Sequence, residues 1–532
     1  MTFSTIDYIV FAGYCFIIIG LGLFISTRKK MSETDSSDYF LAGRALPWWA
    51  IGASLIASNI SAEQFIGMSG SGFAIGLAIA SYEWMAALTL LIVAVFFLPI
   101  FLKKKIFTMP QFLEARFDKR VKTVMAIFWL IVFVFVNLTS ILYLGALAME
   151  RIMGVPMMYG ILGLAVFAAV YSIYGGLKAV AWTDVVQVVF LVGGGLLTTY
   201  FALNYLGGNQ GFFVGFKQLL VQVPEKFDMI LERGSMMVPD GKGGLKDAYL
   251  DLPGISVLIG GMWVANLYYW GCNQYIIQRA LAAKNIREAQ KGLAFAAYLK
   301  ILLPLIVVIP GIAAAALNAD ITKSDEAYPW LLHSFVPSGV KGLAFAALVA
   351  AIVSSLASMM NSISTIFTMD VYREFFNKKS SEQKLVKTGR LVSTVALIVA
   401  MFIAPMLSNI DQAFQYIQEF TGFVSPGALA IFLAGFFYKK ATSNGALAAA
   451  LGTFVFSLLF KIFLPEVPFM DRMGIVFLLC AALIWIFALI EGNRVHTKAI
   501  TIHKSQFHTD GMFKIASIGI IVILIILYAI WW

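Results

Sequence analysis

A short run of polar residues interrupts an apolar segment near the start of the chain. Ser58, Asn59, Ser61, Glu63 and Gln64 fall within seven positions, where a membrane-spanning helix would reach the bilayer centre. Polar and ionisable groups are costly there and persist mainly where they face water or coordinate something. With three glycines following by position 72, the run predicts a helix that breaks midway and offers free backbone groups to a bound solute. The alternative is that these side chains only hold helices together.

A second apolar segment carries the same kind of interruption. It contains Gly260, Gly261, Asn266, Asn273 and Gln274 around an aromatic group at 268–270. It lies five predicted spans after the first, so the two helices cross the bilayer in opposite directions. Matching broken helices in two oppositely inserted halves are typical of an inverted-repeat transporter with its site between the repeats. The repeat is inferred from hydropathy and polarity, because the halves show no direct sequence identity.

The elements that must position these residues are membrane-spanning helices. The 532 residues are 60% hydrophobic and only 13% charged, with a mean hydropathy of +0.85, which excludes a soluble domain. Fourteen runs are long enough to cross a hydrocarbon core of roughly 30 Å. They are 6–26, 48–70, 77–102, 121–149, 155–174, 179–206, 252–277, 290–317, 339–371, 391–407, 412–438, 441–463, 473–490 and 513–532.

The basic residues predict the orientation of these spans. With the N-terminus outside, most of the 39 basic residues fall in inside loops, beginning with Arg28, Lys29 and Lys30. An even number of spans then puts both termini on the extracytoplasmic side. The net charge of +10 is explained by these flanks and predicts no nucleic-acid partner. Three cysteines inside apolar runs, without metal-ligand spacing, predict neither a disulfide framework nor a zinc site.

The expected organisation has five parts. They are a peripheral first helix at 1–30, a first five-helix repeat at 45–206, an extracytoplasmic loop at 207–251, a second five-helix repeat at 252–438 and three peripheral C-terminal helices at 439–532.

Six strings of residues carry a resemblance to a known family. They are FLAGRALPWWAIGASL from Phe40, NISAEQFIGMSGSG from Asn59, IASYEWM from Ile79, WVANLYYWGCNQYIIQR from Trp263, AAIVSSLASMMNS from Ala350 and QAFQYIQEFTG from Gln412. Along nearly its whole length the chain resembles the sodium/solute symporter family, and within it the bacterial sodium/galactose (sodium/glucose) branch. This resemblance implies an all-α membrane protein with a LeuT-like core of two inverted five-helix repeats. It also implies alternating access, with inward sodium flow coupled to solute uptake across a plasma membrane, the inner membrane of a bacterium.

The resemblance further implies a neutral sugar as the solute. Sugar hydroxyls both donate and accept hydrogen bonds, and the ring has an apolar face that stacks on aromatic side chains. The implied sugar-binding residues are Gln64, Glu83, Asn266, Tyr269, Lys300 and Gln418. The implied gating residues are Met68, Tyr82 and Phe414 on the outside, and Tyr269 with Trp270 on the inside. One departure is Ala86, where the galactose branch has a serine, and it leaves the preferred epimer open.

A sodium site follows from the same resemblance. Sodium requires about five or six oxygens, and broken helices supply carbonyls that the helix no longer uses. The implied ligands are the carbonyls of Ala57, Ile60 and Ala351 and the hydroxyls of Ser354 and Ser355. Asp184 would lie on the sodium exit path, although a helix N-terminal cap explains it equally well from local sequence.

Other readings stay open at this point. Glu63 and Glu83 could form an acid/base pair of a membrane-embedded enzyme, but no nucleophile or metal cluster accompanies them. A sodium-coupled symporter of an amino acid, an inositol or a sugar acid is the main alternative. No GxxxxGK[ST] string indicates ATP coupling, and no filter motif indicates a channel. A homodimer is possible in either case.

Overall fold

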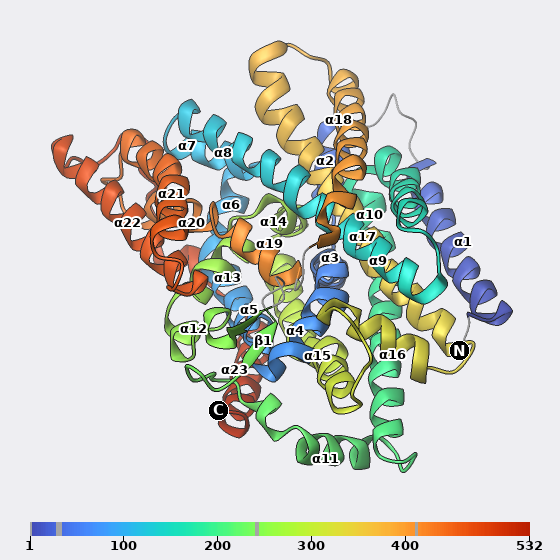
Figure 1. The fold of residues 1–532 in the computed structure, drawn as a ribbon. Coiled ribbons are helices and arrows are strands. Elements are labelled where there is room, and N and C mark those ends of the chain that lie inside the picture. The colour runs from blue at the N-terminus through green and yellow to red at the C-terminus, as the bar shows by residue number, and fades with distance from the viewer. Residues whose placement is uncertain (1–2, 28–34, 240–243, 410–412) are drawn as a thin grey trace.

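The protein is described here by a computed structural model that covers residues 3–27, 35–239, 244–409 and 413–532. Helices make up nearly all of the structure (Figure 1). The basic residues expected to start the first inside loop, Arg28 to Lys30, lie outside the described residues, as does Gln412 at the start of the eleventh run.

The helices follow one another in the order of the expected spans. The first half contains α1 (Thr5–Thr27), α2 (Ser36–Leu41), η2 (Ala42–Arg44), α3 (Trp48–Asn59), η3 (Glu63–Met68), α4 (Ser69–Ile75), η4 (Gly76–Ala80), α5 (Ser81–Ile92), η5 (Val93–Phe97), α6 (Leu98–Lys104), α7 (Met109–Arg116), α8 (Lys119–Val132), η6 (Phe133–Leu138), α9 (Thr139–Met153) and α10 (Met157–Leu206). A connecting segment contains α11 (Phe212–Gln222), η7 (Pro224–Phe227), β1 (Met237–Pro239), β2 (Leu245–Asp247) and η8 (Ala248–Leu250).

The second half is also mostly helical. It contains α12 (Ile255–Ile259), α13 (Gly261–Gly271), α14 (Gln274–Leu281), α15 (Ile286–Ala316), η9 (Ser324–Glu326), α16 (Ala327–Phe335), α17 (Val340–Ile366), η10 (Phe367–Phe376), α18 (Glu382–Ile403), η11 (Ala404–Asn409), α19 (Ala413–Thr421), α20 (Ser425–Phe437), α21 (Ser443–Phe463), α22 (Phe469–Ile490), η12 (Lys504–Phe507) and α23 (Gly511–Ile530). β1 and β2 form an antiparallel hairpin, with Val238 opposite Lys246.

Ten helices in the described residues are long and apolar enough to cross a membrane, and twelve if each of two bent pairs is one span. Two more of the expected spans are present as shorter helices. These are α3, which has 12 residues, and the apolar stretch Met157–Val170. The protein is thus a multi-pass membrane protein, and the count of fourteen stays a prediction.

The first broken helix lies where the polar run predicts it. α3 ends at Asn59, and Ile60 is extended, with φ −75° and ψ 99°. The Ser61 amide, which a continuous helix would aim at the Ala57 carbonyl, instead donates to Gln64 Oε1 over 2.9 Å. A π-helical turn, η3, then restarts the span. The side chain of Gln64 therefore stabilises the break itself.

The second broken helix has two interruptions. α13 is bent by 78° from the helix before it, at Gly260. α13 then ends at Gly271, and Asn273 caps α14 by accepting a hydrogen bond from the Tyr275 amide. Both broken helices that the polar residues predict, one in each half of the chain, are therefore present in the structure.

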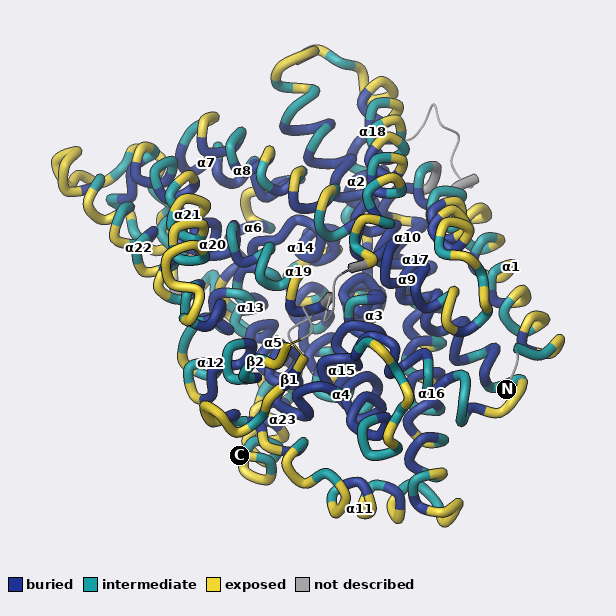
Figure 2. Tube along the Cα trace, in the orientation of Figure 1, coloured by how far each residue is buried: buried dark blue, intermediate teal, exposed yellow. Residues whose placement is uncertain are grey.

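The core surrounds α17, which is buried along nearly its whole length. It packs against α10, α1, α3 and α9. Dark, buried segments gather at α3, α9 and α17, whereas α1 and α21 carry many exposed positions (Figure 2). The buried centre of the molecule is therefore formed around α17.

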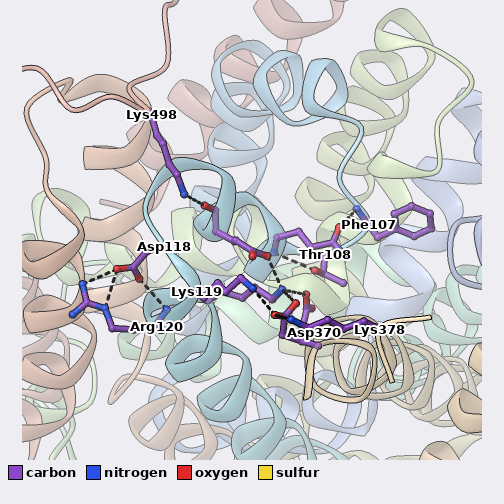
Figure 3. A network of polar contacts seen from close by, with 12 residues as sticks. Phe107, Thr108, Asp118, Lys119, Arg120, Asp370, Lys378 and Lys498 are labelled. Carbon is purple, nitrogen blue, oxygen red and sulfur yellow. Dashed lines mark hydrogen bonds and ion pairs between the residues drawn. The ribbon is translucent and has the colours of Figure 1, made fainter. Parts of the chain in front are cut away.

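A network of charged side chains joins α7, α8 and η10 (Figure 3). The Lys122 ammonium lies 2.6 Å from Glu114, 3.9 Å from Asp370 and 3.8 Å from Glu374. The Lys122 side chain is 4% exposed and that of Asp370 is fully buried. One buried cation thus balances three carboxylates from two different parts of the chain.

Replacing Lys122 with methionine is expected to destabilise the protein by about 3–5 kcal/mol, because it leaves the fully buried Asp370 without its cation. A clear fall in the melting temperature in detergent would show this. Lys119→Met is the matched control, because Lys119 also contacts Glu374, at 2.7 Å, but its side chain is 61% exposed. Its melting temperature should stay near wild type, and an equal fall for both variants would contradict the prediction.

Candidate transport site

A cavity lies between the two broken helices. Its empty space, counted out to its open side, is about 560 Å³. It is lined from α3, η3, α5, α13, α15, α19, α20 and α22. All six residues expected to bind the solute line it, namely Gln64, Glu83, Asn266, Tyr269, Lys300 and Gln418. Residues more than 350 positions apart in the sequence are brought together here.

Several polar atoms at this cavity have unused hydrogen-bonding capacity. Among the described residues, Asn59 Oδ1, the Tyr82 hydroxyl and Asn266 Nδ2 are buried without a hydrogen-bond partner. Buried polar groups normally have hydrogen-bond partners, because a buried group without one costs about 1–3 kcal/mol of stability. These three atoms include hydrogen-bond acceptors and donors, so they suit a ligand whose groups both donate and accept hydrogen bonds.

Glu83 and Lys300 form an ion pair in the cavity wall. Their side chains are 4% and 1% exposed. The Lys300 ammonium also lies 5.1 Å from the centre of the Trp270 ring, in a cation–π contact. Since the two charges balance each other, the cavity offers strong hydrogen-bonding groups without a net charge from this pair.

Aromatic side chains border the cavity on two sides. Tyr82 and Phe414 meet edge to face, with ring centres 5.1 Å apart. Tyr269 accepts a hydrogen bond from Asn59 Nδ2 over 2.9 Å, and its ring centre lies 5.3 Å from that of Trp270. These contacts place four of the five expected gating residues at the cavity. Met68 is fully buried, but it is not among the residues that line the cavity.

Carbonyl groups at the break in the first helix are released from the helix ladder. The usual donor to Ala57 is diverted to Gln64, as described above. The usual donor to Ile60 is the Gln64 amide, which donates to Ser61 over 3.2 Å instead. Hard cations bind carbonyl oxygens of this kind.

α17 presents hydroxyl groups to the same break. Ser355 donates to the Ser58 carbonyl over 2.8 Å, and Ser354 donates to Asp184. Ala351 is fully buried one turn earlier in α17. The structure therefore brings α3 and α17 together at the residues expected to hold sodium. The chemistry of these donors, carbonyl and hydroxyl oxygens, fits that ion.

Asp184 does not cap a helix. It lies in α10 eight residues after Gly176, where the backbone turns with φ 57° between the two halves of that helix. Its carboxylate accepts hydrogen bonds from Ser54 of α3 and Ser354 of α17. The N-terminal cap considered as an alternative is therefore wrong, and Asp184 joins three helices beside the break.

Comparison with known proteins decides the family. The model of the Sodium:solute symporter family matches residues 39–452 of the chain. The chain belongs to this family. The protein is accordingly a transporter and not an enzyme, so the acid/base pairing of Glu63 with Glu83 is not needed. Sodium is its coupling ion.

Two curated relatives of the symporter illustrate the range of similarity. The sodium/glucose cotransporter of Vibrio parahaemolyticus is 54% identical over 547 residues, covering 99% of this chain and 98% of that protein. The sodium/myo-inositol cotransporter 2 of Mus musculus is 33% identical over 475 residues, covering 84% of this chain and 68% of that protein.

A solved structure of a Na⁺-coupled sialic acid symporter, substrate-bound and outward-open, matches the symporter with a TM-score of 0.79. The two share 24% sequence identity, and the match covers 92% of this chain and 98% of the other. At this identity the likeness concerns the fold alone. It confirms the expected all-α membrane fold with a LeuT-like core and broken helices.

Sequence reasoning missed some residues that line the symporter's cavity. Thr421 and Ser425 flank the 47° bend between α19 and α20, and Met473 reaches the cavity from α22. The first two residues stand beside Gly422 and Pro426 within the eleventh apolar run, and this pattern is a signal that could have identified them. Met473 carries none, because it is one apolar residue among many in an apolar helix.

Proposed function

We propose that this symporter takes up a neutral sugar of the galactose or glucose type together with sodium. The observation that carries the proposal is the Glu83–Lys300 ion pair in the wall of a cavity with unused polar groups. The pair itself is neutral, so it binds hydroxyl groups strongly and does not attract a charged solute. Glu63, the other carboxylate of the lining, repels an anionic solute. The name of the Vibrio parahaemolyticus relative, a sodium/glucose cotransporter, supports the same substrate class.

Each residue of the site has a proposed role. Gln64, Asn266 and Gln418 hydrogen-bond the sugar hydroxyls together with Glu83 and Lys300. Tyr269 stacks on the sugar ring and, with Trp270, closes the inner side, whereas Met68, Tyr82 and Phe414 close the outer side. Met68 would act through the packing of η3, since it does not line the cavity.

Sodium would bind at the oxygens of Ala57, Ile60, Ala351, Ser354 and Ser355, and would leave past Asp184. One ion that crosses about 100 mV releases roughly 2.3 kcal/mol. A tenfold sodium gradient adds roughly 1.4 kcal/mol. Together they would hold a sugar gradient of roughly several hundredfold.

The proposed arrangement in the cell is a plasma membrane, in bacteria the inner membrane, with both termini outside. Residues 45–206 and 252–438 would form the two inverted repeats, between peripheral helices at 1–30 and 439–532 and an outer loop at 207–251. A homodimer is part of the proposal, and light scattering on the purified protein tests it.

Tracer uptake into proteoliposomes tests the function. An inward sodium gradient should drive accumulation of labelled galactose or glucose, and potassium should not replace sodium. Excess unlabelled myo-inositol, amino acids and sugar acids should compete weakly. A myo-inositol symporter is the second candidate, because some relatives carry that name. Strong competition by myo-inositol, or the absence of sodium-dependent sugar uptake, would overturn the first choice.

Ala86 gives a test of specificity within this proposal. It lines the cavity one turn after Glu83. Ala86→Ser adds one hydroxyl, worth about 1 kcal/mol, so the affinity for one sugar epimer should rise about fivefold. Competition curves with galactose and glucose measure the change. Ala87→Ser is the control on the same helix, since Ala87 does not line the cavity; parallel changes in both variants would contradict the assignment.

A further inference from the structure

A second large hollow lies on the outside of the helix core, between α12 and α13 on one side and α20 and α22 on the other. It holds about 1370 Å³ of empty space and is here called the lateral groove. Its lining is apolar along most of its length, and Ile259 and Leu478 on its rim are 77% and 65% exposed. The 78° bend at Gly260 turns α12 away from α13 and opens it.

The lateral groove covers about two thirds of the depth of one leaflet. Along α22 its lining runs from Asp471 near the helix start to Leu478. Seven residues at 1.5 Å per residue span about 10 Å, which fits inside one leaflet of a core roughly 30 Å thick. The groove thus faces hydrocarbon at one end and the headgroup level at the other.

The headgroup end of the lateral groove is acidic. Asp471 lies in the first turn of α22, is partly buried and accepts a hydrogen bond from Ser256. The neighbouring Arg472 is engaged elsewhere, because its guanidinium lies 2.9 Å from Glu419. No ion pair of Asp471 occurs among the described residues. A carboxylate at the mouth of an apolar groove in a membrane favours an amphiphile whose headgroup carries an ammonium group.

We propose that the lateral groove binds one phospholipid whose headgroup carries a primary ammonium, a phosphatidylethanolamine, from the leaflet at the α22 start. One acyl chain lies between α13 and α22, and the ammonium group pairs with Asp471. Phospholipids with a purely anionic headgroup are disfavoured there by the same carboxylate.

This lipid would contact the back of the helix that forms the transport cavity. α13 presents Trp263, Val264 and Leu267 to the lateral groove, and Asn266 and Tyr269 to the cavity. On α22 the division falls between adjacent residues, with Met473 at the cavity and Gly474 at the groove. Occupation of the groove therefore supports α13 and favours substrate binding, a consequence that rests on the proposed function.

Native mass spectrometry of the full chain, released from nanodiscs of equal phosphatidylethanolamine and phosphatidylglycerol, tests the proposal. Wild type should retain one phosphatidylethanolamine, about tenfold in preference to phosphatidylglycerol. Gly474→Leu should abolish this retention, because it fills the groove; the Cβ atom itself meets nothing closer than 3.5 Å. Gly163→Leu is the control, since Gly163 is an exposed helical glycine with nothing within 4 Å of a Cβ atom.

Asp471→Asn distinguishes recognition of the headgroup from binding of the acyl chain. It should retain one lipid with no preference between the two headgroups. Equal retention by Gly474→Leu and wild type, or a wild type that retains no lipid or holds both lipids equally, would overturn the proposal. Sugar uptake is measured in parallel: its complete absence in wild type would refute the proposed function and leave the lipid result standing.

Discussion

Lys300→Met is expected to weaken sugar binding at least about tenfold, and sodium-driven uptake with it. Lys300 and Glu83 are both buried and paired in the cavity wall. Removal of one partner from a buried pair costs about 3–5 kcal/mol, because the other charge is left uncompensated. If half of that cost falls on the bound state, sugar affinity drops at least about tenfold. Binding measured by isothermal titration and tracer uptake both report the loss.

The double variant Glu83→Gln with Lys300→Met distinguishes a role of this pair in stability from a role in sugar binding. It removes both charges, so the melting temperature should return toward wild type, whereas sugar binding should stay weakened. Recovery of binding together with stability would mean that the pair is only structural. Lys461→Met serves as the control for loss of a lysine, because Lys461 pairs with Glu419 at 3.1 Å and does not line the cavity. Its sugar affinity should remain near wild type.

The broken helices could be predicted because their cause is local. Ser61 and Gln64 hydrogen-bond to each other across three residues, and this exchange diverts the helix ladder at the break. A run of polar residues at bilayer depth is the sequence signature of such a break. The second break is also local, because Asn273 caps α14 by accepting a hydrogen bond from the amide of Tyr275, two residues later. The position of the cavity therefore follows from sequence, once two such breaks are seen in opposite orientations.

The remaining parts of the site depend on contacts that local sequence does not contain. Asp184 could be either a cap or a bridge from its neighbours alone, because its partners Ser54 and Ser354 lie 130 and 170 residues away. Met473 reaches the cavity only because α22 packs against α13. The span count is uncertain for a related reason. α3 is too short to qualify as a span by length, since the break that makes the site also divides the helix.

Ser355→Ala is expected to raise the sodium concentration for half-maximal uptake by about 10–100-fold. Its hydroxyl lies 2.8 Å from the Ser58 carbonyl, beside the carbonyls of Ala57 and Ile60 that the break releases. A contact to a charged group is worth about 1.5–3 kcal/mol, which corresponds to that change in affinity. Sodium-dependence curves of tracer uptake at saturating sugar measure it, and Ser354→Ala should act in the same direction.

Ser362→Ala provides the matched control on the same helix. Ser362 is also fully buried in α17, but it hydrogen-bonds Gln278 and the Ser358 carbonyl, two turns further from the break. Its sodium dependence should stay within about twofold of wild type. If Ser355→Ala and Ser362→Ala shift the curve equally, the effect comes from loosened packing of α17 and not from a lost ligand. A shift in Ser355→Ala without one in Ser362→Ala indicates an ion at the break, where a hydroxyl and diverted carbonyls meet.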